Sequence, residues 1–467
     1  MIDVTVRISE IILEGFKNTK YGRIEMPSAN NKNLFSKKAD ILGIYGQNGS
    51  GKTAVIEAME FVQILLTGQP LPREAIHYIS KGAENCTITV KFILHTDSKA
   101  TMVEYSIQLN KNQKNELAIA RETLCSAVWN GDKLESKRTL IDYSIYSQGP
   151  AFTPKYRFED LIRNNEENIV NLGVAKKIAQ KDLVSFIFGT EGRSVFLSAS
   201  KSIAEDYAYI IESLYHYASV NLFVISNAHA GAISLNFLIP LAFRLDLGVI
   251  IAKGDLPILL NEPSLISKEH FNMTQQIITE MNIVLETMIP DLSIGIHDFG
   301  EQLLENGSTG HKIELTSNRG ETIIPLKYES EGILKIISVL NALMCVYNNS
   351  SMCLIIDELD AGIYEYLLGE LLSVFEKGAK GQLIFTSHNL RPLEMLNKNS
   401  IVFSTANPSN RYIRMQNIKS NNNLRDMYLR SILLGGQKEN IYEETNSVEI
   451  GRAFRRAGKA VCGECQN

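Results

Sequence analysis

The spacing of hydrophobic positions divides the chain into regions of different period. In the first 30 residues and again between residues 86 and 128, apolar side chains alternate with polar ones, as in strands with one buried face. From about residue 159 to residue 290 the apolar positions recur at helical spacing, and beyond residue 310 short apolar runs alternate with helical segments. The pattern predicts strands at 4–16, 22–26, 41–45, 86–95, 102–109, 117–128, 312–316, 322–327, 352–356 and 382–386, and helices at 53–66, 203–218, 269–288, 333–346 and 364–377.

These elements predict an α/β protein with an added antiparallel β-lobe. The strand at 4–16 is expected at a sheet edge, paired with 22–26, and the three strands between residues 86 and 128 form the lobe, with Asn130-Gly131 as a hairpin turn. A chain of 467 residues is long enough for two or three domains. The expected divisions are the N-terminal half of the α/β unit with the β-lobe (1–155), a helical insertion (156–300), the C-terminal half of the α/β unit (301–436) and a charged tail (437–467).

Composition constrains the environment and the partners. Hydrophobic residues make up 45% of the chain and charged residues 21%, as in an ordinary globular protein. The net charge of −5 gives no global attraction to nucleic acid, so a DNA contact would need a local basic patch. Six scattered cysteines form no disulfide framework and indicate a reducing, cytoplasmic setting. The longest apolar region contains Arg244 and Asp246, which each cost roughly 2.5–3.5 kcal/mol in a membrane span, so no membrane segment is expected.

The most informative motif is a glycine-rich segment between the strand at 41–45 and the helix at 53–66. It matches GxxxxGK[ST], and strand, turn and helix form the context in which that pattern binds phosphate. Its glycines let backbone N–H groups turn toward an anion, and the helix N-terminus adds a partial positive charge. Lys52 is expected to reach the β- and γ-phosphates, and the Thr53 hydroxyl to bind Mg²⁺. The predicted nucleotide-binding residues of this segment are Gly46, Gln47, Asn48, Gly49, Ser50, Gly51, Lys52 and Thr53.

An apolar strand that ends in two acids predicts the second half of a nucleotide site. The strand at 352–356 leads into Asp357 and Glu358. An aspartate beside Thr53 would complete a Mg²⁺ site, and the next glutamate would polarise an attacking water. The alternative is a buried strand whose acids cap the following helix. Because about 300 residues separate the two motifs, the β-lobe and the helical region must be inserted between strands of one sheet.

Three shorter segments complete the set. Ser330 and Gly332 stand at a predicted helix start, where a hydroxyl and a backbone amide can form a second phosphate-binding terminus. That helix terminus cannot reach the phosphate-binding loop at residues 46–53 (the P-loop) of its own chain. It therefore predicts a composite site, which two chains form in a head-to-tail dimer. The alternative is that Ser330 is simply the N-cap of the helix. Asp360 follows the acidic pair. His388 follows the strand at 382–386 and can contact the γ-phosphate, although a lone histidine is more often a surface or core residue.

As a set, these residues resemble the ABC-type ATPase head of the SMC, RecF and OLD group. Walker A (GQNGSGKT), signature (ESEG), Walker B (CLIIDE), D-loop (LDAG) and switch (TSHN) segments occur in that order, within the first 70 residues and residues 313–389. The resemblance implies a mixed sheet with a β-lobe and a helical insertion, and an ATP- and Mg²⁺-dependent hydrolase. The implied roles are catalysis for Glu358 and His388, metal binding for Thr53, Asp357 and the expected Q-loop residue Gln148, and nucleotide contact for Ser330, Gly332 and Asp360.

Two departures from that group narrow the function. No heptad run extends beyond two or three repeats, and only 78 residues follow Asn389, too few for the TOPRIM nuclease domain of OLD proteins. The chain is therefore similar to the OLD-like ATPase subunits of bacterial antiphage systems, the AriA kind of PARIS and the PtuA kind of Septu. That resemblance implies homodimers with composite ATP sites, larger rings built from them, a separately encoded nuclease effector and a phage-encoded trigger.

Other interpretations remain open. A RecF-like DNA-binding ATPase in repair or recombination would need a basic groove across the dimer, against which the net charge of −5 argues. A transporter ATPase subunit fits poorly with the ESEG signature and the large insertion. The tail segment Cys462-Gly-Glu-Cys465 could be half of a zinc site shared by two chains, which needs four ligands, or an unstructured terminus.

Overall fold

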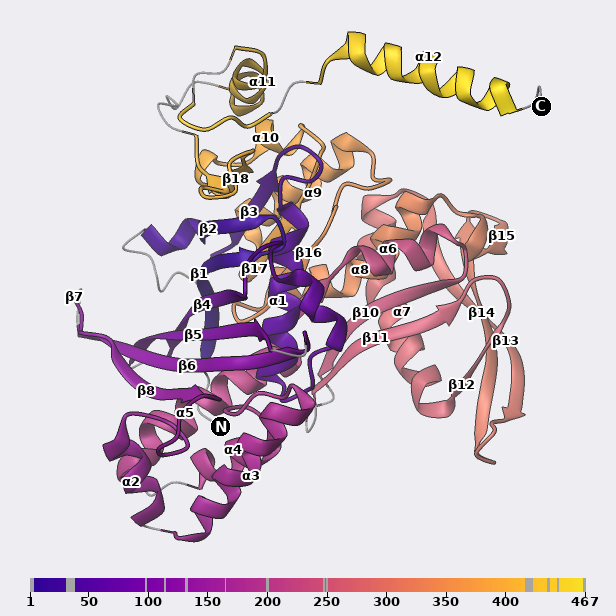
Figure 1. Ribbon diagram of the computed structural model, residues 1–467. Coiled ribbons are helices and arrows are strands. Elements are labelled where there is room, and N and C mark those ends of the chain that lie inside the picture. Colours follow the sequence, from indigo (N-terminus) through magenta and orange to yellow (C-terminus); the bar gives the residue numbers. More distant parts are fainter. Residues whose placement is uncertain are drawn as a thin grey trace.

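A mostly parallel six-stranded sheet carries the motifs in the computed structural model (Figure 1). The structure describes the chain except for residues 1–3, 31–37, 97–98, 113–114, 131–132, 164, 199–200, 247, 249–250, 416–422, 435–436, 443–444 and 465–467. The sheet has the strand order β19–β18–β3–β17–β16–β9. Its strands are β3 (Asp40–Tyr45), β9 (Leu222–Ile225), β16 (Cys353–Ile356), β17 (Gln382–Thr386), β18 (Ile401–Ser404) and the antiparallel edge strand β19 (Tyr412–Ile413). Because β3, β16 and β17 are buried at every position, they are continuous apolar runs, and their carboxyl ends share one edge.

The second sheet is the predicted antiparallel β-lobe. Its order is β2–β1–β4–β5–β6–β7, with β8 paired to β6. The strands are β1 (Thr5–Phe16), β2 (Thr19–Glu25), β4 (Asn85–His95), β5 (Ala100–Lys111), β6 (Leu117–Asn130), β7 (Lys133–Leu134) and β8 (Arg138–Ser144). The pairing of β1 with β2 is confirmed, but the prediction of β1 as an edge strand was wrong, since β1 lies between β2 and β4. The β6–β7 hairpin pairs Asn130 with Lys133, and Gly131 lies outside the described residues.

The P-loop helix α1 (Lys52–Leu66) packs against both sheets in one hydrophobic cluster. Side chains of Gln382 and Ser351 from the parallel sheet also bond the backbone of β1. The Gln382 amide exchanges two hydrogen bonds with Ile8, each 2.7 Å long, and Ser351 Oγ accepts the Val6 N–H. These bonds satisfy backbone groups along the part of β1 that does not pair with β2.

The region expected to be a helical insertion, residues 156–300, is mainly helical in its first half, whereas its second half combines strands with the helix α7. Its helices are α2 (Lys155–Arg163), α3 (Glu167–Asp182), α4 (Thr190–Leu197), α5 (Lys201–His216) with a π-helical end (Tyr217–Asn221), α6 (Asn227–Ser234) and α7 (Lys268–Met288). Between and after these helices lie β9 and the strands β10 (Leu238–Asp246), β11 (Ile251–Leu259), β12 (Ser264–Ser267) and β13 (Leu292–Leu303). Periodicity missed them because short apolar runs do not distinguish a buried strand from a helix.

The C-terminal part first completes a separate antiparallel sheet, in which β14 (Thr309–Arg319) pairs with β12, β13 and β15 (Thr322–Pro325). The chain then returns to the parallel sheet, and its helices are α8 (Glu331–Asn348), α9 (Glu365–Gly378), α10 (Pro392–Met395), α11 (Leu424–Leu434) and α12 (Ser447–Glu464). Short 3₁₀ turns lie at Pro27–Asn30, Arg73–Tyr78, Leu326–Tyr328 and Lys398–Ser400. Within the described residues α8 is the one helix long and apolar enough to span a membrane, but 67% of it is buried, as in a core helix. The tail helix α12 extends away from the sheets (Figure 1), and Cys465 lies outside the described residues.

Candidate active site

The P-loop follows β3 and turns through three glycines with positive φ. The φ angles are 154° at Gly46, 79° at Gly49 and 95° at Gly51, and Gly51 caps the N-terminus of α1. A Cβ on Gly46 would lie 2.0 Å from Ser404 Oγ, so this position has no room for a side chain. The conformation therefore needs glycine, as the sequence motif predicted.

Neighbouring strands support the loop from outside. Tyr412 Oη on β19 donates to the Gly51 carbonyl at 2.7 Å, and the Asn18 amide, in the β1–β2 turn, donates to the Gly49 carbonyl. Ser50 Oγ donates to the Gln47 carbonyl at 2.7 Å and also bonds Ser404 Oγ. Sequence reasoning missed these supports because their contacts with the P-loop arise only when distant segments pack together.

Lys52 is buried beneath the loop. Its Nζ donates to the carbonyls of Gly46 at 2.8 Å and Gln47 at 3.1 Å. Burial lowers the pKa of Lys52, and the nearby carboxylates of Asp357, Glu358 and Asp360 oppose that shift. These carbonyls hold the ammonium at the loop, close to where the predicted phosphates would bind.

The predicted residues converge on one cavity of about 390 Å³. It is lined by Lys17, Asn18, Asn48, Gly49, Gly51, Lys52, Thr53, Ala54, Glu358 and His388. A neighbouring cavity of about 260 Å³ shares Asn48, Glu358 and His388 and adds Asp360 and Ala361. The structure therefore brings the Walker A, Walker B, D-loop and switch segments to one place, although they are spread over more than 300 residues.

Asp357 is held rigidly at the end of β16. Its backbone N–H donates to the Ile225 carbonyl at 2.9 Å, and its Oδ1 accepts the Thr386 hydroxyl. Its Oδ2 is buried and has no hydrogen-bond partner among the described residues. A buried carboxylate oxygen with a free lone pair suits a hard cation, so Asp357 and the Thr53 hydroxyl fit the predicted Mg²⁺.

Glu358 has an uncommon backbone conformation that turns it toward the cavity. Its φ of 47° is left-handed, which costs a residue other than glycine on the order of 1–3 kcal/mol. The Glu358 N–H donates to Thr386 Oγ1 at 2.7 Å, and its carbonyl accepts a hydrogen bond from Lys335 Nζ on α8. Sequence reasoning missed Lys335; a lone lysine inside the apolar run Ile333–Ile337 was the available signal, because buried lysines are rare unless paired.

Asp360 joins the segment after β16 to the segment after β17. Its Oδ2 accepts the backbone N–H groups of His388 at 3.1 Å and Asn389 at 2.9 Å. The His388 side chain is exposed and lines the cavity. The D-loop and the switch segment are thus one hydrogen-bonded unit.

The signature segment lies outside the described lining of either cavity. Ser330 is exposed and caps α8, its Oγ accepting the Ile333 N–H at 3.4 Å, and Glu331 accepts a hydrogen bond from Ser234 on α6. Gly332 is buried, and a Cβ there would lie 1.9 Å from the Gly362 carbonyl. Close packing against the D-loop is therefore a second reason for glycine at this position, besides the predicted nucleotide contact.

Gly332→Ala is expected to force α8 and the D-loop apart. Overpacking of a tight contact typically costs about 1–3 kcal/mol. We expect a lower unfolding temperature and weaker hydrolysis, whereas Gly173→Ala, at a glycine in α3 whose Cβ direction is open, is the matched control and should not lower the unfolding temperature. Equal unfolding temperatures for wild type and Gly332→Ala would contradict the packing explanation.

Gln148 is not brought to this cavity. It is exposed in the loop after β8, where the adjacent Ser147 carbonyl accepts a hydrogen bond from Lys176 on α3. The described residues that line the two cavities do not include it, so the structure gives no support to its predicted role as a Mg²⁺ ligand. The carboxyl end of β9 lies nearer: β9 pairs in parallel with β16 as far as Ile225 and Ile356, and the Asp357 N–H donates to the Ile225 carbonyl, so Ser226 leaves the sheet at the same edge as the acidic pair. The sequence signal for β9 was a short apolar run followed by polar residues, the same pattern that identified β16.

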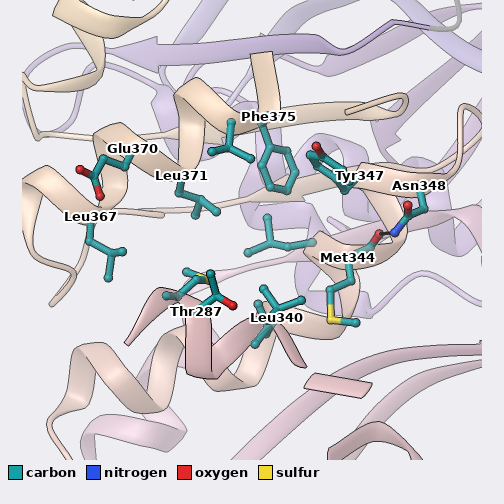
Figure 2. Close-up of a pocket in the computed structure, with 13 residues that line it drawn as sticks. Thr287, Leu340, Met344, Tyr347, Asn348, Leu367, Glu370, Leu371 and Phe375 are labelled. Atoms are coloured by element: carbon teal, nitrogen blue, oxygen red, sulfur yellow. Dashed lines mark hydrogen bonds between the residues drawn. The ribbon is translucent and has the colours of Figure 1, made fainter. Parts of the chain in front are cut away.

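Another cavity of similar volume, about 400 Å³, lies elsewhere, between α7, α8 and α9 (Figure 2). Leu340, Met344 and Tyr347 line it from α8, and Leu371 and Phe375 line it from α9. Apolar side chains cannot replace the hydration of a triphosphate, so this cavity is less suited to a nucleotide than the polar cavity beside the P-loop.

The fold and the site together define a P-loop ATPase with an ABC-type head. The chain belongs to the AAA_21 family, described as "AAA domain, putative AbiEii toxin, Type IV TA system", whose profile matches residues 41–394. Membership of a P-loop ATPase family implies ATP binding. Among curated proteins, none matches the chain.

Several solved structures have similar folds at low sequence identity. An SMC head bound to the C-terminal winged-helix domain of ScpA is 14% identical, with a TM-score of 0.41, and the match covers 87% of this chain and 97% of that chain. The SMC head domain from Thermotoga maritima is 12% identical, with a TM-score of 0.37 and coverages of 88% and 99%. The recombination mediator protein RecF with ATP is 14% identical, with a TM-score of 0.33 and coverages of 82% and 94%. Likeness at this level says nothing about what this chain binds.

Proposed function

We propose that the chain binds MgATP at the P-loop cavity and hydrolyses it. The observation that carries this proposal is the convergence of Lys52, Thr53 and Glu358 on one cavity, with the buried free oxygen of Asp357 close by. Backbone N–H groups of the loop and the Lys52 ammonium would bind the phosphates. Thr53 and Asp357 would hold Mg²⁺, which neutralises charge on the phosphate oxygens.

Glu358 is proposed as the general base. Its carboxylate would accept a proton from the attacking water while His388, on the same cavity wall, contacts the γ-phosphate. The backbone bonds from Thr386 and Lys335 fix the main chain of Glu358, so the carboxylate is positioned before the nucleotide binds.

The site is proposed to be completed by a second copy of the chain. Support comes from Ser330, whose hydroxyl is exposed at the N-terminus of α8 and does not line the P-loop cavity. The residues on either side of it, Glu329 and Glu331, bond Ser317 on β14 and Ser234 on α6. A helix N-terminus with an exposed hydroxyl is suited to an anion supplied from outside the chain. Head-to-tail pairing of two copies would place it against the partner's γ-phosphate.

Lys52→Ala is expected to weaken ATP binding by about 10- to 150-fold, because a charge-assisted hydrogen bond is typically worth about 1.5–3 kcal/mol. Titration calorimetry with ATP measures the effect directly. Lys20→Ala, which removes an exposed lysine on β2, is the matched control and should bind as the wild type does. Equal affinities for all three proteins would place the nucleotide elsewhere.

The biological role that we propose is control of a separately encoded nuclease or toxin in defence against phage. It is supported by the family description, which refers to an AbiEii toxin, and by the sequence resemblance to antiphage ATPase subunits. Cells that carry the chain with its neighbouring genes should plate phage less efficiently than cells with the Lys52→Ala version of the same locus. Equal plating would argue against this role and leave ATP hydrolysis to be judged by its own assay.

A further inference from the structure

Lys335 is a buried charged residue that lies between the signature end of α8 and the proposed general base Glu358. It lies on α8 five residues after the Ser330 cap, and its side chain is 6% exposed. Its Nζ donates a hydrogen bond to the backbone carbonyl of Glu358. A lysine is seldom buried without a compensating partner, so this contact is specific rather than incidental.

The surroundings of Lys335 are acidic. Burial lowers its pKa, while Asp360, Glu358, Asp357 and Glu331 oppose the shift. An ammonium at this position is therefore compensated by the same carboxylates that form the proposed catalytic site. Replacing the charge would alter the electrostatics of that site even without moving the backbone.

The hydrogen bond from Lys335 acts on a strained residue. Glu358 has a left-handed φ of 47°, and its two backbone polar groups are bonded on opposite sides: the N–H to Thr386 on β17 and the carbonyl to Lys335 on α8. Such conformations persist when surrounding contacts determine them. Lys335 is one of these contacts; the Glu358 carbonyl also accepts the Ala361 N–H at 3.0 Å.

A second contact makes the link to α8 rigid. Gly332, in the first turn of α8, packs so closely against the Gly362 carbonyl that no Cβ would fit between them. The N-terminal part of α8 therefore touches both ends of the segment from Glu358 to Gly362. A shift of this end of the helix must move the segment that carries the catalytic base.

We propose that Lys335 is a positioning residue that couples the signature end of α8 to Glu358. Nucleotide held at Ser330 belongs to the partner's P-loop, whereas Glu358 acts at the P-loop of its own chain. Closure of one ATP site would thereby set the orientation of the base in the other site. The inference rests on the proposed function, because it presupposes both hydrolysis by Glu358 and contact between Ser330 and the partner's ATP.

The test replaces Lys335 by methionine, which keeps a long apolar stem and removes the ammonium. For the wild type, two coupled sites should give a Hill coefficient between 1 and 2 in the dependence of hydrolysis on ATP concentration. For Lys335→Met we expect a roughly tenfold or larger loss of kcat, ATP affinity within about twofold of the wild type, and a Hill coefficient of about 1. Lys335→Arg, which retains the charge and the donor, should restore part of the turnover and of the cooperativity.

Ser338→Ala is the matched control on the same helix. Ser338 is buried one turn later, and its Oγ donates to the Lys335 carbonyl, so its loss loosens α8 without touching Glu358. A purely structural role for Lys335 predicts that Ser338→Ala and Lys335→Met lower the unfolding temperature alike and leave the Hill coefficient unchanged, and that result would overturn the proposal. Wild-type turnover or cooperativity in Lys335→Met would do the same.

The proposal and the proposed function fail in different ways. A wild-type protein that binds but does not hydrolyse ATP contradicts the function itself, whereas hydrolysis with a Hill coefficient of 1 in the wild type contradicts only the coupling. Should Lys335→Met not fold, as judged by circular dichroism, Lys335→Gln is measured in its place. Glutamine retains a hydrogen-bond donor without the charge. The turnover and the Hill coefficient expected for Lys335→Met, and the results that would overturn the proposal, apply to it unchanged.

Discussion

Glu358→Gln is expected to bind ATP as the wild type does and to hydrolyse it about 10²–10⁴-fold more slowly, the usual contribution of a general base. Glutamine has the same shape and can still line the cavity, but its amide cannot take a proton from water. The backbone of residue 358 should keep its conformation, because its hydrogen bonds with Thr386, Lys335 and Ala361 are made by main-chain atoms of residue 358, which the substitution leaves unchanged. The measurement is steady-state phosphate release together with ATP titration of the same preparation.

A matched variant separates this effect from a general loss of negative charge. Glu365→Gln changes an exposed glutamate at the start of α9, seven residues further along the chain, and should leave turnover unaltered. Because the two variants have the same net charge, a difference between them reports on the site. Unchanged phosphate release in Glu358→Gln would remove Glu358 from the role of base. If hydrolysis controls separation of the subunits, Glu358→Gln should also prolong an ATP-dependent dimer in size-exclusion chromatography.

Mixing two inactive variants should restore part of the ATPase activity if the site is composite. Ser330→Arg places a long side chain at the exposed N-terminus of α8, which should block closure on the partner while leaving that chain's own P-loop intact. Lys52→Ala damages the P-loop and leaves Ser330 intact. A heterodimer of the two has one site with both defects and one site in which Lys52 and Ser330 are both native. Recovery of phosphate release in the mixture, absent from each variant alone, is the expected result.

The control for this experiment distinguishes the two possible roles of Ser330, which are to cap α8 and to contact the partner's phosphates. Ser330→Asp preserves the helix cap, since aspartate caps as well as serine does, but it adds a negative charge where the partner's phosphates would bind. A simple N-cap predicts that Ser330→Asp hydrolyses ATP normally, whereas a phosphate contact predicts that it is impaired. Absence of recovery in demonstrated heterodimers, combined with full activity of Ser330→Asp, would show that Ser330 is only a cap.

The sequence by itself determined the chemistry at the ends of the core strands. The P-loop, the acidic pair and the switch histidine are each coded within a few consecutive residues. The local order of strand, glycine turn and helix, or of apolar strand and acid, is enough to identify such motifs. The core strands were predicted from the same segments, because strands that are buried on both faces of a sheet are continuous apolar runs. The Ser330 cap and the start of α8 were predicted for the same local reason.

Only the tertiary structure decided which residues support that chemistry. The role of Lys335 depends on a helix packing beside Glu358, and those of Tyr412 and Asn18 depend on strands that meet the P-loop from distant parts of the chain. The position of β9 beside β16, and not the local sequence around Gln148, decides which polar residues lie next to the acidic pair. Contacts between remote segments depend on how whole elements pack, and the period of hydrophobic residues specifies the buried face of an element but not its neighbour.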